Sequence, residues 1–202
     1  MITQTVRIDA GNIDPKKIKR AAKVIKTGGI VAFPTETVYG LAADYANAAA
    51  VKRIYAVKKR PSTKALPVQI SDIAFLERLG CNVPVAAYPL ISAFWPGPLT
   101  LIFKTGGQAT LGVRIPDNPV ARALIKASAC AIVAPSANIS GEPPATSAQE
   151  VLRIFDGRIE MIIDAGETKL QVPSTVIDVS VSPFKIIREG AISRKDLERV
   201  QK

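Results

Sequence analysis

The chain has 202 residues, of which 48% are apolar, and 27 Lys or Arg against 17 Asp or Glu give a net charge of +10. This length predicts one domain over residues 1–202, the apolar content excludes a disordered chain, and no apolar run approaches the roughly 20 residues of a membrane helix. The sequence has no histidine, which excludes Ser–His and Cys–His nucleophilic catalysis and histidine-bound metals.

Helical and strand patterns alternate in the first half of the chain. Asp14 is predicted to cap a helix that has Pro15 in its first turn and ends at Gly28. The predicted buried stripe of this helix consists of Ile18, Ala21, Ala22 and Ile25. The other elements expected in this half are strands over 29–33 and 66–70, a helix over 47–58 with Val51, Ile54 and Tyr55 inward, a helix that opens at Ser71, and a helical stretch over 84–94 broken near Pro89.

Strand patterns dominate the second half. Ser147 and Glu150 form a predicted capping box, and Ser193 with Asp196 opens a last helix. The expected strands cover 99–104, 112–115, 131–134, 160–164, 175–179 and 184–188, and a helix from Asn118 and Pro119 is expected to bury Val120, Ala123, Leu124 and Ala127. This many strands argues against a purely parallel sheet. The predicted fold is therefore α/β with α+β character, a twisted mixed parallel and antiparallel sheet flanked by helices.

The segment PTETVYG, residues 34–40, follows the predicted strand 29–33 directly. Pro34 stops strand pairing because it lacks an N–H, and Thr35 and Thr37 stand on either side of Glu36. Polar groups at the carboxyl end of a buried strand are a common way to build a small-molecule site. A polar turn with a helix cap explains the same residues equally well.

Positive charge is concentrated in one stretch of the chain. No acid occurs between Tyr45 and Ser71, where six basic residues lie: Lys52, Arg53, Lys58, Lys59, Arg60 and Lys64. This field predicts a basic concave cleft that favours a nucleotide, pyrophosphate or nucleic acid. The basic residues of the first helix are interpreted instead as a solubilising surface: Lys16, Lys17, Lys19, Arg20, Lys23 and Lys26.

Two short pairs are candidates for phosphate binding. Lys58 and Arg60 precede Pro61, where the helix must end, and in extended chain their side chains point the same way. They can hold a polyphosphate or simply form a solvated helix end. Ser136 and Asn138 offer a hydroxyl and an amide after the strand 131–134, although turn chemistry is the favoured interpretation there.

Two arginines lie inside or directly after apolar strands. Arg114 stands between Val113 and Ile115, and Arg188 follows Ile186 and Ile187. A buried arginine needs an anionic partner. A substrate carboxylate and a structural Asp or Glu satisfy that need equally well.

The cysteines, the N-terminal segment and the placement of acids set three further expectations. Cys81 and Cys130 have no metal-ligand spacing and are interpreted as ordinary buried thiols of a reducing compartment, in preference to a disulfide or a nucleophile. The N-terminal segment 1–10 lacks the layout of a secretory signal, so a cytoplasmic protein is expected. Since no cluster of carboxylates offers a dedicated metal site, any Mg²⁺ is expected to arrive with a nucleotide substrate.

Seven segments together resemble one known family. They are PTETVYGLAAD (34–44), KKRPSTKALPV (58–68), FWPGPLTLIF (94–103), LGVRIPDNP (111–119), APSANISGEPP (134–144), PSTVIDV (173–179) and IIREG (186–190). In this order, and over nearly the whole chain, they resemble the YrdC-like domain family, whose members are threonylcarbamoyl-AMP synthases. The resemblance implies a single YrdC-like catalytic domain over 1–202, in the short form of the family.

The family resemblance also implies an activity and a set of site residues. The expected reaction joins L-threonine, bicarbonate and ATP into L-threonylcarbamoyladenylate with release of pyrophosphate, the first step of threonylcarbamoyladenosine formation in tRNA. The implied L-threonine-binding residues are Thr37, Gln69, Arg114, Ala134 and Ser174. The implied ATP-binding residues are Arg60, Lys64, Thr110, Ser136, Pro144 and Arg188. The implied catalytic residues, near the reacting phosphates, are Lys58, Arg60 and Asn138.

The sequence departs from the family pattern at three places. Thr63–Lys64 replaces an acidic-then-amide pair, Ala65 replaces proline, and Gln69 replaces histidine. A glutamine can still donate and accept hydrogen bonds, but it does not titrate near neutral pH.

Partners and two other functions complete the expectations. The resemblance implies a downstream tRNA threonylcarbamoyl-transferase machinery, and the charge is compatible with weak tRNA contact and no membrane. A non-catalytic RNA-binding module is one alternative, disfavoured because aromatic residues are only 5% of the chain and show no stacking pattern. A carbamoyl-adenylate-forming domain that uses carbamoyl phosphate is the other, disfavoured because Cys-rich segments are absent.

Overall fold

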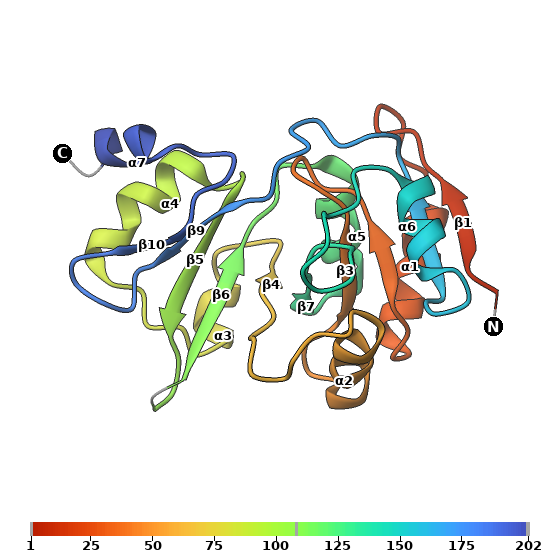
Figure 1. The fold of residues 1–202 in the computed structure, drawn as a ribbon, viewed down its shortest axis with the longest axis horizontal. Helices are drawn as coiled ribbons and strands as arrows, with labels where there is room; N and C mark the ends of the chain where they lie inside the picture. Colours follow the sequence, from red (N-terminus) through yellow and green to blue (C-terminus); the bar gives the residue numbers. More distant parts are fainter. Residues whose placement is uncertain (1, 108, 201–202) are drawn as a thin grey trace.

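The computed structural model describes residues 2–107 and 109–200, in which ten strands form one sheet. The strands are β1 (Gln4–Arg7), β2 (Val31–Phe33), β3 (Gly40–Asp44), β4 (Val68–Gln69), β5 (Leu99–Lys104), β6 (Thr110–Arg114), β7 (Ile132–Val133), β8 (Met161–Asp164), β9 (Thr175–Asp178) and β10 (Lys185–Arg188). Their order is β1-β8-β2-β3-β7-β4-β6-β5-β9-β10 (Figure 1). Strand pairs such as β4–β6 are parallel and others such as β2–β3 antiparallel, which confirms the predicted mixed sheet.

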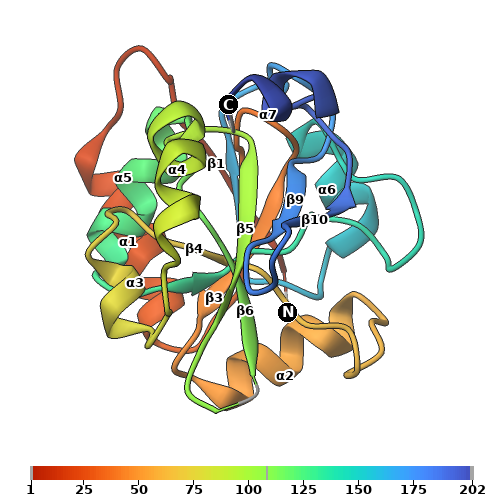
Figure 2. The same ribbon diagram turned by 90° about the vertical axis from the view of Figure 1, so that its left-hand side faces the viewer.

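Helices cover both faces of this sheet. They are α1 (Pro15–Lys26), α2 (Ala48–Val57), α3 (Phe75–Arg78), the 3₁₀ helix η1 (Val85–Ala87), α4 (Tyr88–Phe94), α5 (Pro119–Ser128), α6 (Ala148–Phe155) and α7 (Arg194–Val200). Figure 2 shows α1 and α5 on one side of the sheet and α6 on the other. The predicted arrangement of a sheet flanked by helices is therefore confirmed. In the described part of the chain, no helix has the length and apolar character needed to span a membrane.

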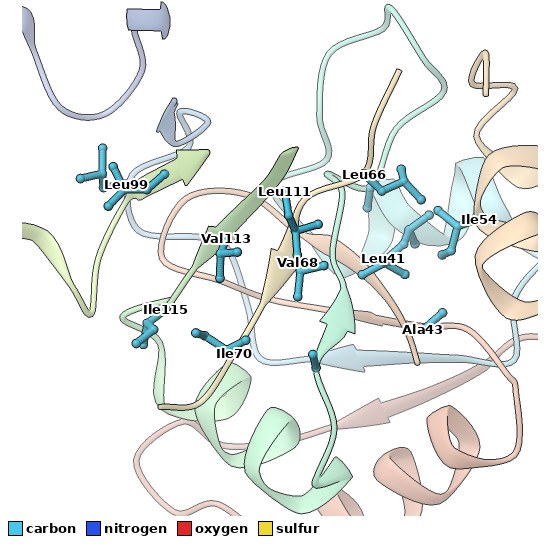
Figure 3. Packing of buried hydrophobic residues seen from close by; sticks show 14 of the residues in the cluster. Leu41, Ala43, Ile54, Leu66, Val68, Ile70, Leu99, Leu111, Val113 and Ile115 are labelled. Atoms are coloured by element: carbon cyan, nitrogen blue, oxygen red, sulfur yellow. The ribbon is translucent and has the colours of Figure 1, made fainter. Parts of the chain in front are cut away.

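Two apolar clusters fill the space between sheet and helices. Because side chains alternate along a strand, Val31 and Phe33 of β2 join the cluster under α1 and α5, while Ala32 joins the opposite cluster. Figure 3 shows Leu41 and Ile54 in that second cluster, which reaches along the sheet to Leu99. The cluster that contains Ala32 extends under the sheet from Ile162 of β8 to Ile177 of β9.

Helix boundaries follow the predicted capping residues. Asp14 accepts a hydrogen bond from the amide of Lys16 at 2.8 Å, and Gly28 takes a φ of +84° after the helix ends. The predicted stripe of α1 is buried, which confirms it, and its six basic residues are exposed, while their interpretation as a solubilising surface stays a prediction. At α6 the Ser147 hydroxyl accepts from the amide of Glu150, whereas the Glu150 carboxylate accepts from the amide of Thr146, one residue beyond a standard capping box.

Four predictions of local structure need correction. β1 and β3 were not predicted as strands, and each is paired on the sheet, β3 with β2 and β7. The helix expected at Ser71 begins only at Phe75 and lasts four residues. The fully buried face of α5 contains Ala121 and Ile125, whereas the predicted Ala123 and Ala127 are only partly buried against the same cluster. Burying Ile125 against α1 removes more apolar surface from water than burying an alanine.

Candidate active site

The segment 34–39 forms the loop that joins β2 to β3, with Phe33 opposite Gly40. Thr35 organises it: its hydroxyl donates to the carbonyl of Val38 at 2.7 Å and accepts from the amides of Thr37 and Val38. The Thr35 and Thr37 hydroxyl oxygens lie 2.8 Å apart, and both side chains are buried. Since a hydroxyl has one proton, and that of Thr35 goes to Val38, Thr37 is the donor in this contact.

Arg114, at the end of β6, reaches into this loop. Its Nη2 donates to Glu36 Oε1 at 2.6 Å, its Nη1 to Thr37 Oγ1 at 3.0 Å and its Nε to the carbonyl of Gly97 at 3.0 Å. The arginine is 5% exposed and the glutamate 7%. Burial lowers the pKa of the Arg114 guanidinium, and the Glu36 carboxylate offsets part of that effect. Of the two partners left open by the sequence, the structural acid is present.

A cavity of about 120 Å³ opens beside the Arg114 side chain. It is lined by the loop 34–40, by residues of β4 and β6, and by the segments 134–136 and 173–174. Three arginines, Arg60, Arg114 and Arg188, contribute to its wall, and no acid does among the described residues. This charge favours an anionic ligand, while the wider basic cleft stays a prediction.

Arg188 and two hydroxyls form another part of the wall. Arg188 donates to the carbonyl of Ser174 from Nε at 3.1 Å and from Nη2 at 2.7 Å. The Ser174 hydroxyl lies 2.9 Å from that of Thr100 on β5. Although Arg188 as a residue is exposed, partial burial of its guanidinium lowers its pKa, and the nearby charges of Arg114 and Arg60 lower it further. The three cations therefore repel one another, and a bound anion would relieve this repulsion.

Gln69 has an acceptor available for a ligand. It lies on β4 opposite Arg114 in the parallel β4–β6 pair, and it is 4% exposed. Its Oε1 has no hydrogen-bond partner among the described residues. A buried amide oxygen without a partner is costly, so a donor from a ligand would satisfy it.

Lys58 and Arg60 do not point the same way. Lys58 has helical backbone angles and Lys59 has a φ of +49°, so this segment turns and the predicted extended arrangement is wrong. The Lys58 side chain is 1% exposed, which also excludes a solvated helix end for it. Arg60 lines the cavity, and its Nε and Nη2 donate to the carbonyls of Lys64 and Ala65.

The residues Ser136 and Asn138 also face different surroundings. Ser136 lines the cavity and donates to Asn138 Oδ1 at 2.6 Å. The Asn138 Nδ2 donates to the carbonyls of Ile139 at 2.8 Å and Glu142 at 2.7 Å, so its amide closes the loop. The favoured turn interpretation is therefore confirmed for Asn138, and only Ser136 faces the cavity.

The predicted site residues gather in one place to a large extent. All five of the predicted threonine-binding residues line the cavity: Thr37, Gln69, Arg114, Ala134 and Ser174. Three predicted ATP-binding residues join them: Arg60, Ser136 and Arg188. The other predicted residues are not in its lining: Lys58, Lys64, Thr110, Asn138 and Pro144. Thr110 is exposed at the β5–β6 hairpin, opposite Lys104, and Lys64 is exposed before β4.

Several lining residues were not singled out from the sequence. Thr100 is a lone hydroxyl within the apolar strand 99–103, and that position is a usable signal. Pro173 lies in a segment already quoted for the family resemblance. Pro67 and Pro135 carry no functional group that would mark them in advance.

Metal and thiol chemistry have little support in the described chain. Residues 2–107 and 109–200 contain no group of three Cys, Asp or Glu side chains placed to hold a metal ion. Cys81 and Cys130 are free and half-buried, and burial raises the pKa of each thiol to about 11. Such thiols stay protonated and unreactive at neutral pH.

A mixed sheet with three arginines around a small buried cavity defines an α/β protein with a site suited to a small anionic ligand. Residues 23–190 match the model of the Sua5/YciO/YrdC family, which carries the description "Telomere recombination". The chain belongs to this family.

Curated relatives and a solved structure agree with this assignment. Proteins named threonylcarbamoyl-AMP synthase from Pyrococcus abyssi and Bacillus subtilis are 45% and 44% identical, each over 93% of this chain. The chain spans only 58% and 57% of their respective lengths. The crystal structure of P. abyssi Sua5 complexed with L-threonine superposes with a TM-score of 0.92 at 42% identity, covering 99% of this chain and 61% of that one.

Proposed function

We propose that the chain synthesises L-threonylcarbamoyladenylate from L-threonine, bicarbonate and ATP and releases pyrophosphate. The observation that carries this proposal is the convergence of eight predicted substrate residues on one cavity with three arginines in its wall. The curated relatives bear the name of this activity, and a close structural neighbour binds L-threonine. Mg²⁺ would come with ATP, since the reaction needs its charge and the described chain offers no acidic cluster for it.

In this proposal, threonine takes the part of the cavity beside Arg114. The guanidinium has five N–H groups, of which three serve Gly97, Thr37 and Glu36, so each terminal nitrogen keeps one for the substrate carboxylate. The Thr37 hydroxyl has donated its proton and can only accept from the substrate. Gln69 Oε1 is a second acceptor for the threonine amine or hydroxyl.

ATP takes the part beside Arg60 and Arg188. Glu36 balances the charge of Arg114, whereas the described structure shows no acidic partner for Arg60 or Arg188. The two unbalanced cations suit a polyphosphate, and the balanced pair suits a zwitterionic amino acid. Charge therefore sorts the two substrates within one cavity.

The chemistry needs positioning more than covalent help. The neutral threonine amine attacks the carbon of bicarbonate or CO₂ and gives a carbamate, with loss of water from bicarbonate or, for CO₂, with loss of a proton from the nitrogen to solvent. One carbamate oxygen then attacks the α-phosphorus, and the bond to the bridging oxygen breaks as pyrophosphate leaves. Arg60 and Arg188 stabilise charge on the phosphates. Because the carbamate is already an anion, no histidine base is required.

The product is an unstable mixed anhydride. We therefore propose that it is handed to a downstream tRNA threonylcarbamoyl-transferase machinery. Weak tRNA contact through the basic surface is compatible with the net charge of +10.

The test is product identification with isotope-labelled bicarbonate, ATP and L-threonine. The proposal expects pyrophosphate and a labelled adenylate, each dependent on threonine. A label-free adenylate formed only when carbamoyl phosphate is supplied would favour the carbamoyl-adenylate alternative. No adenylate from either donor, together with retained RNA binding, would favour the RNA-binding module.

A further inference from the structure

The Lys58 ammonium uses all of its protons inside the protein. Its Nζ donates to the carbonyl of Ser136 at 2.5 Å, to the carbonyl of Asn138 at 2.7 Å and to Asn138 Oδ1 at 3.2 Å. An ammonium has three N–H donors, so none is left for a phosphate. All three acceptors belong to a single segment, residues 136–138.

The Lys58 backbone holds Ser140, two residues after this segment. The carbonyl of Lys58 accepts from the amide of Ser140 at 2.8 Å. On the opposite side, the amide of Ala137 donates to the carbonyl of Tyr39 at 2.7 Å. The loop 136–140 therefore lies between the end of α2 and the loop that follows β2, with Lys58 as its attachment on the α2 side.

Residues only two positions apart in the sequence face different surroundings, the cavity in one case and the protein interior in the other. Arg60, two residues after Lys58, lines the cavity, and so does Ser136. Lys58 and Asn138 lie behind them, and neither is in the cavity wall. Each of the two pairs thus supplies one residue to the cavity and one to the support of the loop.

We propose that Lys58 is a positioning residue: it fixes Ser136 and the loop 136–140 and does not touch the substrate, whereas Arg60 is the cation of the pair that faces it. A buried ammonium is costly unless its donors are all satisfied, and here the three oxygens of the loop satisfy them. Removing the ammonium leaves the carbonyl of Asn138 without a donor, whereas the Ser136 carbonyl keeps the Asn138 amide and Asn138 Oδ1 keeps the Ser136 hydroxyl. The loop thus loses its side-chain attachment to the end of α2 and keeps only its internal hydrogen bonds there. The proposal deepens the proposed function and rests on it for the activity measurement only.

The first measurement needs no substrate. Amide hydrogen exchange is compared between wild type, Lys58→Met and a matched control, Lys59→Met, whose side chain is exposed. Amides of the loop, including those of Ala137 and Ser140, should exchange at least about tenfold faster in Lys58→Met and be unchanged in the control. Equal exchange in all three proteins would overturn the proposal, because a lysine reserved for phosphate does not hold the ligand-free loop.

The second measurement separates positioning from contact by two double-mutant cycles on kcat/KM for pyrophosphate release. The double variant Lys58→Met/Ser136→Ala should have a kcat/KM at most about threefold below that of the less active single variant, because both residues act through one loop. In the double variant Lys58→Met/Arg60→Ala, the fold-decrease in kcat/KM should nearly equal the product of the two single fold-decreases. The reverse pattern would identify Lys58 as a phosphate contact and contradict the proposal.

A substitution that unfolds the protein would not leave the question open. Lys58→Gln keeps two of the donors on a shorter side chain and replaces Lys58→Met if that variant does not fold. If the protein released no pyrophosphate at all, the proposed function would fail while hydrogen exchange would still decide the role of Lys58. The two failures are therefore distinguishable.

Discussion

Arg114 and Glu36 form the contact on which the proposed threonine side of the cavity depends. They lie 78 positions apart in sequence, and their side chains meet at 2.6 Å with little exposure. Glu36 stands in the loop 34–39 and Arg114 on β6, so the ion pair also fixes one end of that loop. A buried pair of this kind is strongly destabilising when one partner is removed.

Arg114→Lys should weaken threonine binding selectively. A lysine keeps the charge but cannot serve Glu36, Thr37 and Gly97 while also gripping a carboxylate. The threonine KM should rise roughly 10- to 150-fold, the range for one charge-assisted hydrogen bond of about 1.5–3 kcal/mol. Titration calorimetry should find ATP binding little changed. Weakened ATP binding with intact threonine binding would mean that the two sides of the cavity are exchanged.

Arg60→Ala should slow the reaction without unfolding the chain. Loss of a cation that stabilises phosphate charge costs about 2–4 kcal/mol of barrier, which is roughly 30- to 1,000-fold in rate. Circular dichroism checks the fold, and Lys52→Ala, at an exposed site on α2, is the matched control. Unchanged adenylate formation by a folded Arg60→Ala protein would remove Arg60 from the site.

The buried Lys58 makes stability depend on alkaline pH. Burial, with a smaller contribution from the charge of Arg60, lowers the pKa of Lys58 from 10.5 to about 8. Between these values the unfolded chain binds more protons at this position than the folded chain, so the free energy of unfolding rises with pH there. The difference in free energy of unfolding between wild type and Lys58→Met should therefore increase with pH, by at most about 1.4 kcal/mol per pH unit.

Urea unfolding of both proteins at steps from about pH 7 to about pH 10 measures this difference, because other titrating groups are common to the two. A difference that does not change with pH would show that Lys58 keeps its ordinary pKa in the folded chain.

At the scale of elements, the turn after β10 supports the cavity wall at the start of β9. The Thr175 hydroxyl donates to the carbonyl of Ile192 at 2.7 Å and accepts from the amides of Gly190 and Ile192. The amide of Ala191 donates to the carbonyl of Pro173. This turn therefore holds Pro173 and Ser174 in the lining.

Gly190→Ala should displace that wall. A Cβ at Gly190 would clash with the carbonyl oxygen of Pro173 and lie 2.7 Å from the carbonyl carbon of Ser174. Such crowding against backbone typically costs about 1–3 kcal/mol, and threonine binding should weaken with it. The control is Gly106→Ala, since nothing lies within 4 Å of a Cβ built at Gly106. Equal thermal midpoints for the two variants would contradict the close packing.

The sequence predicted elements best where local signals were strong. Asp14, Asn118 and Ser147 each cap the helix that was expected after them. β3, with the sequence GLAAD, has weak strand propensity and is a strand because β2 and β7 pair on both its sides. Such tertiary pairing cannot be read from a local pattern.

The sequence predicted which residues line the site better than it predicted how they are arranged. The family resemblance and residue chemistry named the cavity residues Arg60, Arg114 and Ser136. Spacing alone placed Lys58 beside Arg60, and the φ of +49° at Lys59 overturned that placement. The partner of Arg114 was also beyond reach, because no local rule links a strand arginine to an acid in a distant loop.

At the scale of the whole molecule, charge is divided between a surface and a site. The exposed lysines of α1 lie on one face of the sheet, while the cavity arginines Arg60 and Arg188 are assigned to ATP in the proposed reaction. The proposed synthesis of the adenylate should therefore proceed without RNA. Any tRNA contact should be non-specific, weaken steeply with salt and compete with ATP.

Threonine-dependent pyrophosphate release by nuclease-treated protein, measured with and without added tRNA, decides whether the chain is a synthase. We expect release that requires threonine, bicarbonate and ATP and that proceeds at the same rate when tRNA is absent. An absolute requirement for tRNA, or no release under either condition by a folded protein, would contradict this expectation and favour a nucleic-acid-binding module.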